Sequence, residues 1–405
     1  MTEDDLLARI DAKASLDFLA EMVRHKSYSQ TEGERKLAAY MCERMTAIGL
    51  DAKLTPVEGE RVNAIGVRKG AGGGKSLLFN GHLDTNPATE GWTVDPWGGV
   101  VDDKFIYGIG VSNMKAGDAA YFCALKTLID AGVKLKGDVI LTYVVGELQG
   151  GVGTLAAINQ GWKADYFINT EPTDIGALTM HAAAFTFIIE LTGITRHLSK
   201  REQAVDVISA ACDLIPRLNG MTFSGARSDE HRSINRAHVG VVHGALGKSL
   251  EEWRPPQVAD FLRIKGSARY APGQNETQVL ADMRKVLDDL ERRFPGLKTV
   301  LIPEHQVGRP AMPPFEVARD ARIVKVVNRA YEKIRGTKQP TGPLGPPGFY
   351  GTDASHFYSR LGMEGIVCGP GGRYNTMPDE RVDIPDYLDA IRIYLLAMLD
   401  ICERA

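Results

Sequence analysis

SLLFNGHLDT (76–85) decides the fold: it is an apolar run that ends in turn residues. Such runs are typical of strands buried on both faces of a parallel sheet. The same signal recurs in DVILTYVVGEL (138–148) and DYFINTE (165–171). Apolar residues at helical spacing occupy 15–26, 34–48 and 115–132. The alternation predicts an α/β unit with a mainly parallel sheet covered by helices on both faces.

The pattern changes near residue 178. Strands are predicted at 185–193, 237–246, 260–270 and 298–304, and helices at 204–218 and 276–294. Their order is β-α-β-β-α-β, which is ferredoxin-like. The α/β alternation then returns, with a helix at 318–334, a strand at 364–369 and a helix at 385–403. We expect a catalytic α/β domain made of 1–177 and 309–405, with an inserted α+β lid over 178–308.

Bulk composition points to an ordinary globular protein. The 405 residues carry a formal net charge of -3, which gives no electrostatic footprint for nucleic acid or an anionic membrane. Five scattered cysteines form no C-x-x-C pair, so free thiols in a reducing compartment are expected. No apolar stretch approaches a membrane span, and the N-terminus has no signal-peptide pattern. A cytoplasmic location follows.

Ionisable side chains fall where predicted buried strands end. His82 and Asp84 end one strand, and Glu147 and Glu171 end the other two. In an open α/β sheet, ligands bind at the carboxyl ends of the strands. An Asp near a His can hold the ring and set its tautomer. Because buried carboxylates are costly unless something pairs them, the four together favour a functional site.

Seven motifs carry a family resemblance over nearly the whole chain: GHLDTNP (81–87), YGIGVSNMKAG (107–117), GELQGGVGT (146–154), NTEPT (169–173), GITRH (193–197), GTDASHF (351–357) and GPGG...PDERV (369–382). Their order and spacing resemble the zinc metallopeptidase family that holds glutamate carboxypeptidase, aminoacylase, acetylornithine deacetylase and succinyl-diaminopimelate desuccinylase. The resemblance implies a lid that forms a homodimer and two zinc ions bridged by an Asp. It also implies hydrolysis of an amide next to a carboxylate-bearing group in a small-molecule substrate.

Four residues of the catalytic domain take roles from this resemblance. His82 and Glu171 match ligands of the first metal, and Asp84 matches the residue that orients His82. Glu147 matches the general base.

The resemblance also assigns roles outside the metal ligands. His197, in the lid, matches a histidine that reaches the partner subunit's site and steadies an oxyanion. Arg269 falls near a position that grips a substrate carboxylate, although a surface arginine on a strand is the alternative interpretation. Gly371 and Gly372 are expected to offer backbone N–H groups to the substrate.

The remaining metal positions depart from the family. Asn113 stands where the bridging Asp belongs, Leu148 where the second-site Glu belongs, and Thr376, beside Asn375, where the last His belongs. An amide, an aliphatic side chain and a hydroxyl lack the charge that a second cation needs. We therefore expect no metal, or a single weakly bound divalent ion such as zinc, and assign Asn113, Thr376 and Asn375 to substrate binding.

These departures leave three functional hypotheses. The first is a hydrolase-like enzyme that cleaves a C–N bond, metal-independent or mononuclear, with Glu147 as general acid/base. The second is a catalytically silent homologue that binds small molecules or acts as a scaffold. The third is a conventional two-zinc deacylase or peptidase, which needs ligands from elsewhere, with His181 and His356 as candidates.

Overall fold

The computed structural model describes residues 1–252, 255–304 and 310–405. It groups them into two compact units, Met1–Met180 with Phe315–Pro347 and Thr352–Ala405, and His181–Pro314 with Gly348–Gly351. The domain boundary expected between residues 308 and 309 lies outside the described residues. Within the described residues, no helix is long and apolar enough to cross a membrane.

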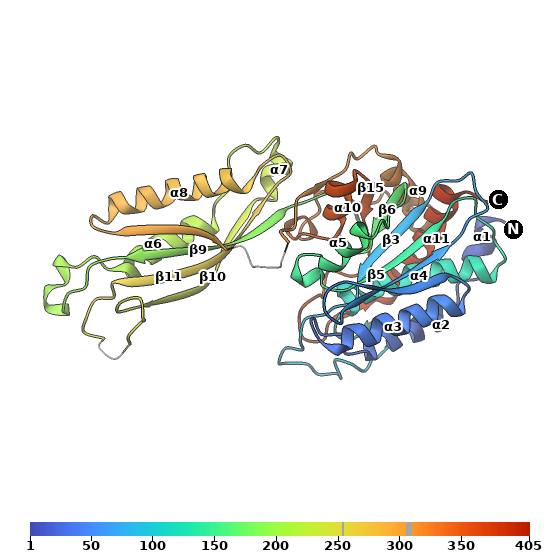
Figure 1. The fold of residues 1–405 in the computed structure, drawn as a ribbon, viewed down its shortest axis with the longest axis horizontal. Coiled ribbons are helices and arrows are strands. Elements are labelled where there is room, and N and C mark those ends of the chain that lie inside the picture. The colour runs from blue at the N-terminus through green and yellow to red at the C-terminus, as the bar shows by residue number, and fades with distance from the viewer. Residues whose placement is uncertain (253–254, 305–309) are drawn as a thin grey trace. The chain divides into compact units, whose positions relative to one another are not determined.

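The first unit is built on an eight-stranded sheet (Figure 1), in the order β1-β2-β5-β3-β6-β15-β7-β14. Its strands are β1 (Asp51–Pro56), β2 (Val62–Arg68), β3 (Leu77–His82), β5 (Val139–Val144), β6 (Tyr166–Asn169), β7 (Ala177–Leu178), β14 (Thr341–Gly342) and β15 (Glu364–Val367). The central strands β5, β3, β6 and β15 run parallel. Every residue of β3 and β5 is buried, so both faces of the sheet are covered. The predicted mainly parallel α/β fold is confirmed.

Helices cover this sheet. They are α1 (Glu3–Leu7), α2 (Ala12–Arg24), α3 (Glu32–Ala47), α4 (Ala116–Asp130), α5 (Val152–Asn159), α9 (Arg322–Arg335), α10 (Ala354–Leu361) and α11 (Ile384–Cys402). α3 contacts β1 and β2, α4 and α11 contact β3, and α9 and α10 contact β15. A short strand pair, β4 (Phe105–Tyr107) and β16 (Arg381–Asp383), ties two long loops together.

The second unit has the predicted ferredoxin-like order. It contains β9 (Ala183–Thr192), α6 (Val207–Asn219), α7 (Asp229–Ser233), β10 (Arg236–Ala245), β11 (Phe261–Tyr270), α8 (Glu276–Arg293) and β12 (Lys298–Glu304). The sheet order β10-β11-β9-β12 is antiparallel throughout. Alternate residues of β9 point into a separate apolar core that α6 and α8 close. Two further short strands are β8 (Met180–His181), at the boundary of the two units, and β13 (Phe315–Glu316), in the first unit.

Candidate active site

Neighbouring parallel strands bring the predicted side chains to one edge of the sheet. His82 is the last residue of β3, and Glu171 follows the end of β6 by two residues. The expected strand 138–148 is too long, because β5 ends at Val144 and Glu147 opens a 3-10 turn, Glu147–Gln149. Gly146 has φ +80°, a left-handed conformation that turns the chain out of the strand. β3 also ends before Asp84, so strand alternation does not set the direction of that side chain.

Both ring nitrogens of His82 face oxygen atoms. Nδ1 lies 2.9 Å from the main-chain oxygen of Asp84 and 3.5 Å from its carboxylate. Nε2 lies 3.1 Å from Oδ1 of Asn113 and 3.4 Å from Oε1 of Glu171. Burial opposes a charge on the ring, but Glu171 and Asp84 outweigh it and raise the pKa of His82 well above its ordinary value. Asp84 therefore holds the ring chiefly through its carbonyl group, not through the carboxylate expected from sequence.

The carboxylate of Asp84 organises the loop that carries Glu147. Its Oδ1 accepts the backbone N–H groups of Gly146 at 2.8 Å and Glu147 at 3.2 Å, and its Oδ2 accepts that of Leu148 at 3.2 Å. Burial alone would raise the pKa of Asp84, but His82 and these N–H groups lower it. Asp84 thus stays ionised while completely buried.

A second set of contacts reaches this loop from α3 and β2. The Arg61 guanidinium pairs with the buried carboxylate of Glu34 and donates to Oε1 of Gln149 at 2.9 Å. Gln149 donates to the Ser29 hydroxyl at 2.6 Å, and Ser29 donates to Asp84 at 3.1 Å. The loop is therefore held from both sides by side chains that sequence motifs did not single out.

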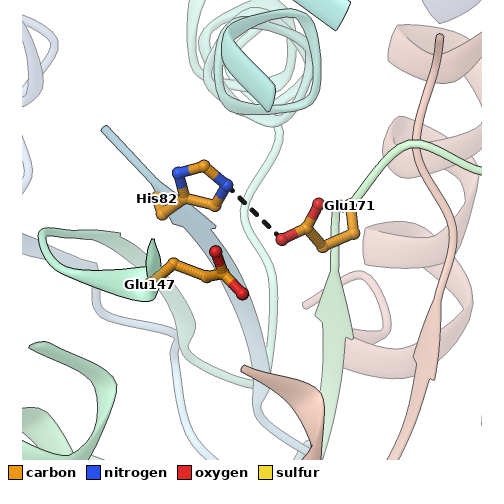
Figure 2. A group of neighbouring side chains, drawn as sticks. All are labelled: His82, Glu147 and Glu171. Carbon is orange, nitrogen blue, oxygen red and sulfur yellow. Dashed lines mark ion pairs between the residues drawn. The ribbon is translucent and has the colours of Figure 1, made fainter. Parts of the chain in front are cut away.

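His82, Glu147 and Glu171 form one group that could hold a metal ion, since each offers an atom within 4.8 Å of the others. Figure 2 shows the two carboxylates and the imidazole ring facing one another. Burial and the Glu171 carboxylate raise the pKa of Glu147 well above its ordinary value. Glu147 remains partly exposed and makes no side-chain hydrogen bond within the described residues. It is therefore placed to accept or release a proton.

A cavity of about 320 Å³ opens beside His82 in the first unit. Its walls are His82, Asp84, Thr85, Asn86, Pro87, Thr89, Trp92, Ile109, Gly110, Asn113, Leu148, Thr376, Met377 and Glu380. The three positions that depart from the family, Asn113, Leu148 and Thr376, all lie on this wall. Asn375 is half-buried and is not among the residues that line the cavity.

The glycine loop offers fewer donors than expected. The N–H of Gly372 already donates to the Ser112 hydroxyl at 2.8 Å, and the carbonyl of Gly371 accepts the N–H of Asp174. Gly371 has φ +82° and so requires a residue without a side chain. The N–H of Gly372 thus has an internal acceptor in Ser112, and the expected donation from Gly371 and Gly372 to substrate stays a prediction.

Glu380 is a buried residue of the cavity wall that the sequence did not single out. Its Oε1 accepts the backbone N–H groups of Ser112 at 2.9 Å and Asn113 at 3.2 Å. Burial nevertheless raises its pKa to about 7. Its position four residues after Thr376, within the PDERV motif, was the signal that could have identified it.

Asp353 belonged to a quoted motif but had no predicted role. It is almost completely buried, and its Oδ2 accepts the Thr154 hydroxyl at 2.8 Å. Burial raises its pKa to about 7. The histidine of the same motif, His356, lies in α10 with Nε2 2.9 Å from the carbonyl oxygen of Gly150. That contact engages Nε2, and the metal-binding group found among the described residues consists of His82, Glu147 and Glu171 without His356.

Three predicted residues lie in the second unit. His197 is exposed, with Nδ1 3.0 Å from the Ser199 hydroxyl, and it caps a short 3-10 helix. Arg269 is a half-buried residue of β11. His181 has Nδ1 3.1 Å from the carbonyl oxygen of Ala182. The roles expected for His197 and Arg269 stay predictions.

The donor set fits one metal ion better than two. Imidazole and carboxylate oxygens are the usual ligands of zinc, and catalytic sites commonly use three of them. His82, Glu147 and Glu171 supply such a set. A second ion would have to be held by Asn113, Leu148 and Thr376, which bring no charge to the wall they share. Among the described residues, His82, Glu147 and Glu171 supply one candidate metal-binding group, and Asn113, Leu148 and Thr376 add no charged ligand to it.

The fold and this group of side chains define a protein of the metallopeptidase class. The sequence profile of Peptidase family M20/M25/M40 matches residues 78–400, and the chain belongs to that family. It is 24% identical over 361 residues to the N-formyl-4-amino-5-aminomethyl-2-methylpyrimidine deformylase of Bacillus subtilis, covering 84% of this chain and 83% of that protein. It is 26% identical over 327 residues to the succinyl-diaminopimelate desuccinylase of Helicobacter hepaticus, covering 77% and 76%.

Solved structures share the fold. The aminopeptidase PepT from Bacillus cereus superimposes with a TM-score of 0.75 at 19% identity, covering 98% of this chain and all of that one. The family and the architecture expected from the seven motifs are confirmed.

Proposed function

We propose that this protein is a hydrolase that cleaves a C–N, amide-type bond in a small carboxylate-bearing molecule, with Glu147 as the general acid/base. The observation that carries the proposal is the Glu147 carboxylate, partly exposed and within 4.8 Å of both His82 and Glu171. Burial and Glu171 raise the pKa of this carboxyl above its ordinary value, which strengthens its carboxylate form as a base toward water. The names of the two relatives, a deformylase and a desuccinylase, support an amide-type bond.

The chain's own residues account for the proton steps. Glu147 removes a proton from water as the water attacks the carbonyl carbon, and it later donates that proton to the departing amine. His82, held at Nδ1 by Asp84, presents Nε2 to the same space and can donate to the oxygen that gains charge. His197, brought by the lid of a partner subunit, is proposed to steady the same oxygen. Arg269 is proposed to bind the substrate carboxylate.

We propose that at most a single divalent ion, such as zinc, is bound by His82 and Glu171, which leaves the neighbouring Glu147 to act as the base. A bound ion would lower the pKa of coordinated water and polarise a carbonyl group. General-base help alone contributes roughly 10²–10⁴-fold, which favours a reactive acyl group if the ion is absent.

The test is turnover of N-acyl amino acids by the purified protein, with and without 1,10-phenanthroline. We expect Glu147→Gln to lose at least about 100-fold in kcat, while the exposed carboxylate variant Glu43→Gln keeps the activity. Full turnover in Glu147→Gln would remove this residue from the mechanism.

One observation favours a second candidate, a homologue that binds small molecules without transforming them. The residues Asn113, Leu148 and Thr376 turn one wall of the site into a neutral surface that suits binding more than metal chemistry. Saturable binding of N-acyl amino acids without turnover would support it.

We further propose that the protein forms a homodimer through the second unit and resides in the cytoplasm. β10 is an edge strand, and Val241 and Val242 on it are each 43% exposed. Exposed apolar edge strands are sites of strand pairing between chains. All five cysteines are free, which suits a reducing compartment. Light scattering of the wild type and of Val241→Lys tests the dimer, since the charged variant is expected to be monomeric.

A further inference from the structure

We infer that the part of the substrate that enters the cavity beside His82 is uncharged and apolar, so that this chain selects amides with an aromatic or branched aliphatic group on the side of the scissile bond remote from the carboxylate. The inference rests on the proposed function, because it assumes that the bond is cleaved at Glu147. It names the substrate class that the cavity can admit.

Much of the cavity wall is apolar. Trp92, Ile109, Leu148 and Met377 line it together with Pro87. Apart from His82, Asp84 and Glu380, the polar lining residues are neutral amides and hydroxyls. Leu148 directly follows Glu147, so apolar surface adjoins the proposed base. Buried apolar surface favours an apolar ligand group by roughly 25 cal/mol per Å².

The charged residues of the cavity wall disfavour a substrate carboxylate. Besides His82, the ionisable residues of the wall are Asp84 and Glu380, and no lysine or arginine is among the lining residues. The Asp84 carboxylate is already satisfied by backbone N–H groups, and His82 faces the carboxylate of Glu171. A substrate carboxylate in this cavity would lie near Asp84 and Glu380, and His82, the one basic side chain among the lining residues, already faces Glu171, so its burial there is unfavourable. The carboxylate of the proposed substrate must therefore lie elsewhere.

The volume of the cavity suits a ring or a branched chain better than a small acyl group. A cavity of about 320 Å³ accommodates a phenyl ring or a branched chain. A formyl group would leave most of the apolar wall without contacts, and unfilled space forfeits dispersion energy. An apolar group of about benzoyl size uses the wall that Trp92 and Ile109 provide.

The test uses Glu147→Gln, which should bind without turnover, and isothermal titration with three amides. N-benzoylglycine and N-benzylsuccinamate each carry an aromatic group on one side of the amide and a carboxylate on the other. N-succinylglycine carries carboxylates on both sides. We expect at least one of the first two to bind roughly 10–100-fold more tightly than N-succinylglycine.

Variants of the wall separate this selectivity from general damage. Leu148→Glu should abolish the preference, and Leu148→Met should keep it. Because Met377 is 42% exposed, Met377→Glu adds a charge at the rim without disturbing the core and should weaken the preference. Equal or tighter binding of N-succinylglycine, or no binding of any probe at millimolar concentration, would overturn the inference. Selective binding by Glu147→Gln without any turnover in the wild type would overturn the proposed function and leave the inference standing.

Discussion

The Asp84 carboxylate accepts the backbone N–H of Glu147 at 3.2 Å, while the Asp84 carbonyl oxygen lies 2.9 Å from Nδ1 of His82. One residue therefore fixes both the imidazole and the loop that carries the proposed base. Three successive N–H groups converge on this buried anion, an arrangement that stabilises its charge. Asp84 couples the geometry of the site to the stability of the fold.

Asp84→Asn should therefore lower both activity and stability. The amide retains the shape but loses the charge, and its NH₂ group faces N–H donors. We expect the free energy of unfolding to fall by about 2–4 kcal/mol and kcat to fall by at least about 100-fold. Urea denaturation and steady-state kinetics measure the two effects. Ser29→Ala, which removes the hydrogen bond to the same carboxylate and the acceptor of Gln149, should cost about 1–3 kcal/mol. If Asp84→Asn kept the wild-type free energy of unfolding and kcat, the hydrogen bonds from the three N–H groups would not require the charge of the carboxylate.

The metal content of the protein is the second prediction. Purified without chelator, the wild type should hold at most about one zinc per chain, and Glu171→Gln should hold none. Restoring charged ligands in the triple variant Asn113→Asp, Leu148→Glu, Thr376→His should raise the value to about two. Elemental analysis after gel filtration gives the numbers. A wild-type value near two would mean that ligands outside the His82–Glu147–Glu171 group complete a second site.

The sequence placed most of the elements that it named to within a few residues, because buried parallel strands have a strong apolar signal. No strand bounds were predicted for β1 and β2, which pair at one edge of the large sheet. The ends of the buried parallel strands were predicted poorly. DVILTYVVGEL (138–148) is apolar throughout, yet the N–H of Val145 donates to Oδ1 of Asn63 and Gly146 turns the chain away. The glycine was a visible signal, but the partner 82 residues earlier was not.

The candidate site also has a part that the sequence predicted and a part that it did not. His82, Glu147 and Glu171 could be brought together from sequence alone, since parallel strands end at one edge of the sheet. The cavity wall could not, because Trp92 comes from a long loop without periodicity and Met377 from another. The hydrogen bond from the N–H of Gly372 depends on Ser112, 260 residues away in the sequence. Such contacts are decided by tertiary packing and not by local pattern.

Glu380 should give stability a distinctive pH dependence. Burial raises the pKa of its carboxyl from 4.5 to about 7, so between these values the folded chain holds a proton that the unfolded chain has released. The free energy of unfolding therefore falls as the pH rises through this window and levels off above it. Glu380→Gln removes the titration and keeps an acceptor for Ser112. Its stability relative to the wild type should increase from pH 5 to 7, by up to roughly 3 kcal/mol. Urea denaturation at several pH values measures both proteins. A difference in the free energy of unfolding between wild type and Glu380→Gln that stays constant from pH 5 to 7 would contradict the prediction.

Arg61 supplies the last prediction. Its guanidinium contacts both oxygens of the Glu34 carboxylate at 2.8 Å, and the side chains are 13% and 1% exposed. Removing one partner of a buried pair strands the other charge, so Arg61→Met should cost about 3–5 kcal/mol.

Pairing Arg61→Met with Glu34→Gln removes the stranded charge and should recover most of the loss in urea denaturation. The exposed pair of Lys69 with Asp138 is the control, since Lys69→Met should cost no more than about 1 kcal/mol. Because Arg61 also holds Gln149, the double variant should remain less active than the wild type even where its stability returns. Full recovery of kcat would mean that the loop keeps Glu147 in place without Arg61, and equal costs for Arg61→Met and Lys69→Met would mean that burial of the first pair is unimportant.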